Sequence, residues 1–370
     1  MTTSSATLSI QGDRETFALR LRSGLTHWLR RDGLAVLAYA LVTIAMTYPI
    51  AFKLGEDWLA KRDIDTNMKV WDQWWFGRVM QEHLPTDYTR DLFYPTGLDL
   101  TYHSVSWSVV ALAWLLTPLL GAIDAYNVTI LLAVFLTAYA GYLLLRSMVH
   151  HRAAAWLGGA VYSFAPYHIA HTGGHPDLVH LAPIPIAALM FTRALTEGRL
   201  RFALGAALAL GVAALTSLYI MDFALITLAL LFIFLALDRS RWRTAQFWKV
   251  VAVFGAASAL ALAVRLIPIL RSPDALTSAI EQKYEAADKQ TDLLSFVIPS
   301  HFNPNFAPYV GEIALCFVMN QKWPAYLGMV PLVLGLSALT WKEHRRRTWT
   351  WLTSSPSPTG VRTISTSTHF

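Results

Sequence analysis

The sequence has little charge and almost no cysteine. Only 15% of its 370 residues are charged and 55% are hydrophobic, which is more apolar surface than one soluble core could bury. The single cysteine, Cys316, excludes an intramolecular disulfide. Its apolar neighbours Leu315 and Phe317 favour an inert packed thiol over a thiolate nucleophile. These shortages point to a membrane protein.

The basic N-terminal tail, residues 1–33, also lacks a small-residue cleavage site after an apolar run, so we expect no removed signal peptide. Its five arginines are expected to stay in the cytoplasm. The net charge of +6 lies in short clusters between apolar runs. That pattern is an orientation signal and does not indicate nucleic-acid binding.

Long apolar runs dominate the rest of the chain. Windows of about 20 apolar residues predict an all-α, polytopic integral membrane domain over residues 34–345 with about eight transmembrane helices. The predicted spans lie near residues 34–52, 125–147, 153–170, 178–195, 201–219, 218–237, 246–270 and 323–341.

Residues 104–123 form a further apolar run, which charge argues against as a span. If this run lies along the outer surface, the arginine-bearing loops 146–152, 193–201, 238–243 and 341–347 all fall on the cytoplasmic side. We therefore interpret it as an interfacial helix.

Two polar stretches are then expected outside the membrane. Outer loop 53–124 carries nine acidic and six basic residues between Lys53 and Ser104, a sign opposite to that of the cytoplasmic loops, and a second outer loop covers 271–322. The Ser/Thr/Pro-rich tail, 346–370, is expected to be disordered. Its abrupt change of composition suggests a truncated or frame-shifted end of a longer protein.

Asp63 and Asp65 follow the first span. In an extended loop both carboxylates could point to the same side, and a pair can divide the roles of general base or metal ligand and orienting group. An ordinary solvated acidic loop is the alternative. The next stretch is predicted to be an amphipathic interfacial helix, with Val70, Trp71, Trp74 and Trp75 on one face and Asp72, Gln73 and Arg78 on another.

Four further groups are candidates for substrate binding. Tyr94 lies in a Pro-Thr-Gly turn, and His103 follows it and could line a site or be merely solvated. Arg265 and Arg271, at the outer end of a span, could pair with an anionic phosphate or extend toward lipid headgroups.

A short outer loop holds His168, His171, His175, Asp177 and His180. A metal site is conceivable, but the spacings match no standard zinc signature. We favour a histidine, His175, that hydrogen-bonds a phosphate or sugar hydroxyl, with a cap for the following helix as the alternative.

These features together resemble the GT-C superfamily of polytopic membrane glycosyltransferases, in its bacterial branches. The resemblance covers roughly residues 30–345 and rests on the order of its motifs. They are the Asp-x-Asp pair, Trp71-x-x-Trp74-Trp75, Pro118-Leu119-Leu120-Gly121, Ala125-Tyr126-Asn127, Ser163-Phe164-Ala165-Pro166-Tyr167, Gly174-His175, Asp292-Leu293-Leu294-Ser295, Ile298-Pro299-Ser300 and Tyr326-Leu327-Gly328.

The resemblance implies an enzyme of the bacterial plasma membrane that takes a sugar from a polyprenyl-phosphate donor and passes it to an unidentified acceptor at the outer face. By motif position Asp65 would be the base, with Asp63 beside it. His175, Arg265 and Arg271 would assist the leaving phosphate. No cofactor is implied with certainty, although a divalent cation is possible. A lipid-linked-sugar transporter or flippase, or a non-catalytic membrane assembly subunit, are the rival interpretations.

Overall fold

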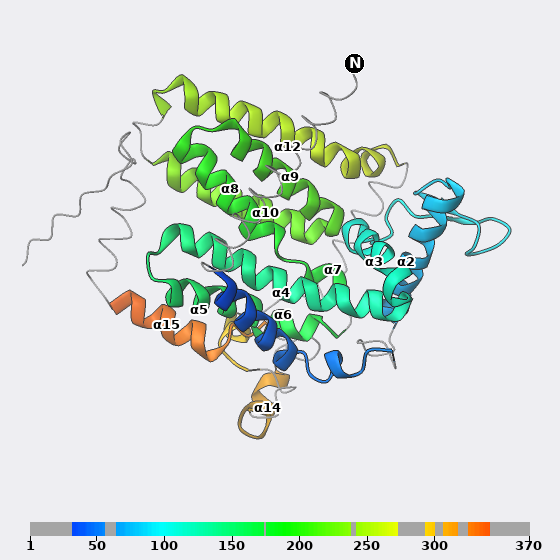
Figure 1. Ribbon diagram of the computed structural model, residues 1–370, viewed down its shortest axis with the longest axis horizontal. Coiled ribbons are helices and arrows are strands. Elements are labelled where there is room, and N and C mark those ends of the chain that lie inside the picture. The colour runs from blue at the N-terminus through cyan, green and yellow to red at the C-terminus, as the bar shows by residue number, and fades with distance from the viewer. Residues whose placement is uncertain are drawn as a thin grey trace, which may run out of the picture.

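The computed structural model describes residues 32–55, 64–173, 175–237, 242–272, 293–299, 306–316 and 325–340. These residues are mostly helical, and the helices form an elongated bundle (Figure 1). The bundle is built from the helix Asp32–Met46, α4 (Ala122–Met148), α5 (Arg152–Ser163), α6 (Pro166–His171), α7 (Pro176–Val179), α8 (Pro183–Glu197), α9 (Leu200–Thr216), α10 (Leu218–Ala236) and α12 (Ala245–Arg271).

The remaining elements lie around this bundle. They are η1 (Ile50–Phe52), α2 (Ile64–Glu82), the two-residue strands β1 (Tyr88–Thr89) and β2 (Leu98–Asp99), α3 (Trp107–Leu120), η2 (Leu293–Phe296), α14 (Ala307–Leu315) and α15 (Met329–Thr340). The two strands pair antiparallel. The sequence predicted an all-α fold, to which the structure adds this short hairpin.

Four helical segments are long and apolar enough to cross a membrane: Ala122–Met148, Pro176–Glu197, Leu218–Ala236 and Ala245–Arg271. Each coincides with a span predicted from the sequence. Large apolar side chains also point outward from the bundle, for example Leu208 on α9 (69% exposed) and Leu260 on α12 (76% exposed). Because exposing so large an apolar surface to water is unfavourable, the chain is a membrane protein.

The core of the bundle lies between α8, α9, α10 and α12, which share one cluster of buried side chains. A second contact joins the first helix to α4 and α5. There Tyr39 stacks on Trp156, with ring centroids 5.2 Å apart, and the Tyr39 hydroxyl donates to the Trp156 carbonyl at 2.6 Å. The Tyr142 hydroxyl of α4 donates to Asp32 at 2.9 Å. Asp32 and Gly33 therefore belong to the helical domain rather than to the predicted N-terminal tail.

Two predicted spans differ in the structure. The span expected over 153–170 is divided, because α5 ends at Ser163 and Pro166 starts the separate helix α6; a residue before proline is disfavoured in the helical conformation. In the span expected over 34–52, the helix ends at Met46, three residues before Pro49.

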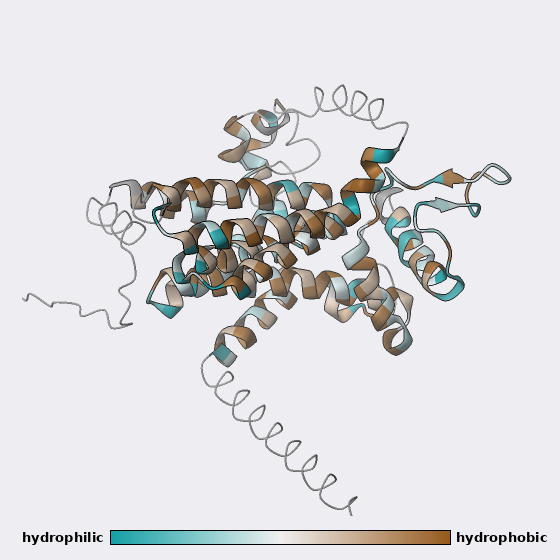
Figure 2. Ribbon diagram, turned by 90° about the horizontal axis from the view of Figure 1, so that it is seen from above, coloured by the Kyte–Doolittle hydropathy of each residue, from teal (hydrophilic) through white to brown (hydrophobic). Residues whose placement is uncertain are grey.

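Helices α2 and α3, with the β1–β2 hairpin, lie together at one end of the bundle, which we call the polar end (Figures 1 and 2). Gln73 of α2 bonds the Ala122 carbonyl at the start of α4. The hydroxyls of Ser108 in α3 and Thr216 at the end of α9 are 2.7 Å apart. Helix α3 has 14 residues, about 21 Å at 1.5 Å per residue.

The structure also corrects the expectation that Cys316 is a packed thiol. The thiol is exposed rather than packed, because it directly follows the surface helix α14. Residues 1–31, most of the second outer loop and the predicted tail 346–370 lie outside the described residues.

Candidate functional site

A buried carboxylate is the centre of the polar end. Asp72 of α2 has 0% of its surface exposed, and its Oδ1 accepts from Nε2 of His103 at 2.5 Å. Lys69 Nζ lies 3.7 Å from the other carboxylate oxygen. We call Lys69, Asp72 and His103 the Asp72 cluster. Charges this deeply buried persist only when they are paired.

The local sequence explains why the three groups meet. Lys69 and Asp72 are three residues apart on α2 and therefore share a helix face. Lys69 Nζ also donates to the carbonyl and, at 3.0 Å, to the hydroxyl of Ser104. These bonds hold the chain between β2 and α3 against α2, which places the His103 imidazole over the carboxylate.

Arg265 lies close to the cluster in space, although it comes much later in the sequence. Its Nη2 donates to the His103 carbonyl at 3.4 Å, and the nearby Tyr102 hydroxyl donates to the Ile269 carbonyl at 3.3 Å. Within the described ranges no carboxylate oxygen lies within 4 Å of the Arg265 guanidinium. The last turns of α12 are thereby fixed beside the segment that carries His103.

A cavity of about 300 Å³ borders Arg265, and we call it the Arg265 cavity. Its walls come from α12, α3 and the hairpin, and they include Trp107, Thr101 and the exposed Asp87. A cation inside such a space, without an ion-pair partner among the described residues, can bind an anionic group of a ligand.

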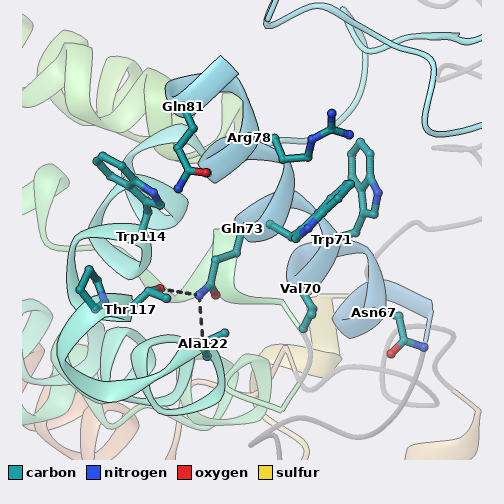
Figure 3. A pocket seen from close by; sticks show the side chains of 12 residues that line it. Asn67, Val70, Trp71, Gln73, Arg78, Gln81, Trp114, Thr117 and Ala122 are labelled. Atoms are coloured by element: carbon teal, nitrogen blue, oxygen red, sulfur yellow. Dashed lines mark hydrogen bonds between the residues drawn. The ribbon is translucent and has the colours of Figure 1, made fainter. Parts of the chain in front are cut away.

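A larger groove of about 700 Å³ separates α2 from α3 (Figure 3). The indoles of Trp71, Trp74 and Trp114 border it, and we call it the indole groove. Trp71 also packs edge-on against the His103 ring, with centroids 5.9 Å apart. Trp71 therefore borders the groove and also contacts the Asp72 cluster.

The predicted candidates are only partly brought together. His103 and Arg265 meet at the polar end, as just described. Arg271 is exposed at the last residue of α12, and Tyr94 is 85% exposed in the hairpin turn. His175 lies with its ring 5.4 Å from that of His171, in the connection between α6 and α7.

The two aspartates of the Asp-x-Asp pair are placed differently. Asp63 lies outside the described residues. The backbone of Asp65 belongs to the first turn of α2, which begins at Ile64. The extended conformation expected for Asp65 is therefore wrong, because the helix starts before it.

The histidine-rich segment folds into the bundle rather than forming a surface loop. His168 is 1% exposed and both its ring nitrogens face main-chain carbonyls, of Ser163 and of Val179. His175 occupies the N-cap position of α7, but its side chain makes no capping hydrogen bond.

A metal site can be tested on the same side chains. Among the described residues no three His, Cys, Asp or Glu side chains come together as possible metal ligands. Both ring nitrogens of His168 face main-chain carbonyls. The presence of this histidine, one of those that suggested a metal, is therefore explained by its contacts with the main chain.

Sequence reasoning missed Asp72 and Lys69 as site residues. The predicted helix is present, but its polar face is not turned to solvent: Asp72 is fully buried whereas Trp74 is 50% exposed. The face is buried because His103 and Ser104 fold over it. A Lys-Asp pair at helical spacing in a tryptophan-rich segment was the available signal.

The fold and the polar end together define a helical membrane protein with a buried ionic cluster and two cavities at one end of its bundle. The chain matches the family model described as a domain of unknown function, DUF6311, over residues 35–361. The chain therefore belongs to this family. A comparison with curated proteins gives no match.

Proposed function

We propose that the chain is a membrane glycosyltransferase that moves a sugar from a polyprenyl-phosphate donor to an acceptor at the extracytoplasmic face. The observation that carries the proposal is the meeting of Arg265 and His103 beside the Arg265 cavity, at 3.4 Å between Nη2 and the carbonyl oxygen. A guanidinium that borders a cavity can bind the phosphate of a lipid-linked donor.

The proposed topology has about eight spans in the bacterial plasma membrane. Besides the four long segments, the proposed spans are the helix Asp32–Met46, α5 with α6, α9 and α15. The N-terminus is cytoplasmic, and α2 and α3 lie along the outer interface. Two observations support this orientation. The basic loops 146–152 and 193–201 connect helix ends remote from α2 and α3, and the tryptophans of α2 suit the interface.

The phosphate of the donor would bind Arg265. A guanidinium removed from bulk water binds phosphate more strongly than an exposed one, because water screens it less. Arg271, six residues further along α12, is exposed and adds positive charge to the same end of the helix. Asp87, which also lines the cavity, is exposed, so water screens its repulsion of the phosphate.

In the proposed reaction the carboxylate of Asp65 takes the proton of an acceptor hydroxyl. The hydroxyl oxygen forms a bond to the anomeric carbon as the bond from that carbon to the phosphate oxygen breaks. The lipid phosphate leaves with the electron pair, and the configuration at the anomeric carbon inverts. Asp63 would orient Asp65. His103 and Arg265 would stabilise the leaving phosphate, and His175 and Tyr94 would contact more distant parts of the substrates.

The test is transfer of radiolabelled sugar from a panel of polyprenyl-phosphate sugars, in membranes with matched protein levels. Asp65→Asn should lower the rate by about two or more decades. The control, Asp222→Asn, changes an exposed carboxylate of α10 and should transfer at the wild-type rate. Equal transfer by Asp65→Asn would contradict the role of Asp65.

The rivals predict a different result. A transporter or a non-catalytic assembly subunit would bind the lipid-linked sugar but transfer nothing, and Asp65→Asn would leave that binding unchanged. Binding without transfer in the wild type would therefore favour a rival over the enzyme.

A further inference from the structure

We propose that the indole groove is a carbohydrate-binding subsite, separate from the Arg265 cavity. The two spaces share no lining residue. Asp72 and Gln73 are consecutive on α2, about 100° apart around the helix axis. Asp72 faces His103, while Gln73 faces α3 and borders the groove.

Gln73 supplies an unused hydrogen-bond acceptor beside the groove. Its side chain is 94% buried, since 6% is exposed, and its Nε2 donates to Thr117 Oγ1 and to the Ala122 carbonyl, both at 3.2 Å (Figure 3). The Thr117 hydroxyl already donates to the Ala113 carbonyl, so both partners of Gln73 can only accept. The amide orientation is therefore fixed, and Oε1 has no partner.

Two more amides border the same groove. Asn67 and Gln81 are exposed, and neither side-chain amide hydrogen-bonds within the described ranges. They are 14 residues apart on α2, which corresponds to about 20 Å at 1.5 Å per residue. A ligand that used both of these exposed amides would thus be elongated and would carry hydroxyl or amide groups at intervals.

The walls between these amides are aromatic. Trp71 and Trp74 come from α2 and Trp114 comes from α3. One face of a sugar ring carries C–H groups and packs on an indole, while its hydroxyls remain free to bond amides. A flat aromatic wall with amides along its edge suits a carbohydrate.

Other ligand classes fit less well. A hydrocarbon chain would cover the three amides without offering them hydrogen bonds. An anion would need a free cation, but Arg78 is already bound by Glu82 and Asp91, each at 2.7 Å. The groove therefore favours a neutral, hydroxyl-rich ligand.

Under the proposed function, on which this assignment rests, the bound carbohydrate is the acceptor. The donor phosphate is placed at Arg265. Trp71 of the groove packs on the ring of His103, and the carbonyl of His103 accepts from Arg265. An acceptor sugar in the indole groove would lie along α2, the helix whose first turn contains Asp65.

The experiment measures saturation-transfer NMR signals of cellobiose, chitobiose and maltose with the full chain in lipid nanodiscs. At least one disaccharide should bind the wild type. Trp74→Ala and the double variant Asn67→Ala/Gln81→Ala should each raise its dissociation constant at least tenfold. The matched control is Trp248→Ala, because Trp248 is also 50% exposed but lies in the first turn of α12, away from the groove.

The Asp65→Asn variant separates this inference from the proposed function, because it should bind the disaccharide as the wild type does. Disaccharide binding by a wild type that shows no transfer activity would leave the groove assignment standing and overturn only the enzyme. Equal affinity in Trp74→Ala and Trp248→Ala would overturn the groove assignment, as would saturation of none of the three sugars.

Discussion

His103 Nε2 lies 2.5 Å from Oδ1 of Asp72, a carboxylate with no exposed surface that precedes it by 31 residues. The main-chain oxygen of the same histidine accepts a bond from Arg265, 162 residues later. One residue thus connects the tryptophan-rich helix α2 to the last turns of α12.

Breaking this arrangement should destabilise the protein. Asp72→Asn leaves the Lys69 ammonium, 4% exposed, without its carboxylate. Loss of one partner of a buried ion pair costs about 3–5 kcal/mol, and the melting temperature in a fixed detergent should fall accordingly. Glu82→Gln, which removes a surface partner of Arg78, should leave the melting temperature nearly unchanged. Equal effects of the two substitutions would show that the Asp72 cluster is not a buried ionic centre.

Arg265 should determine affinity for lipid phosphate. Arg265→Gln removes the guanidinium of the Arg265 cavity, and the loss of a charged hydrogen bond, about 1.5–3 kcal/mol, corresponds to roughly 10–100-fold weaker binding of polyprenyl phosphate. Arg201→Gln is the control, because Arg201 is exposed and stacks on Phe202 at the start of α9. Titration of both variants by native mass spectrometry tests the prediction, and unchanged affinity in Arg265→Gln would contradict it.

Close packing of α4 against α5 depends on Gly159. A Cβ there would lie 2.6 Å from the Ala138 carbonyl oxygen and 2.8 Å from the Tyr142 nitrogen, both main-chain atoms. Gly159→Ala should therefore destabilise by about 1–3 kcal/mol. Gly255→Ala, in α12 with nothing within 4 Å of the added carbon, should stabilise by about 0.5–1 kcal/mol. Thermal melts that rank the two variants in the opposite order would refute this packing account.

The sequence predicted much of the bundle because lipid imposes a simple rule on it. A span needs about 20 apolar residues, and residues 125–147 and 246–270 satisfy that rule without help from their neighbours. Helix ends were harder, because Pro166 divides a run that hydropathy alone joins.

The candidate site was predicted only in part. His103 was selected because it follows the Pro-Thr-Gly turn and Arg265 because it lies at the outer end of a span, but their contact depends on a fold that joins residues 162 positions apart. Asp72 was assigned to a solvated face, because a single helix does not show which chain segment will cover it. The unpartnered Oε1 of Gln73 could not be predicted either, because it follows from where Thr117 and Ala122 come to lie.

The most direct test of the central claim is a structure of the protein in nanodiscs with a non-cleavable polyprenyl-phosphonate sugar. The account predicts that the phosphonate lies in the Arg265 cavity, within hydrogen-bond distance of the Arg265 guanidinium and next to His103. A ligand whose phosphonate binds elsewhere on the bundle, with the Arg265 cavity unchanged, would contradict it.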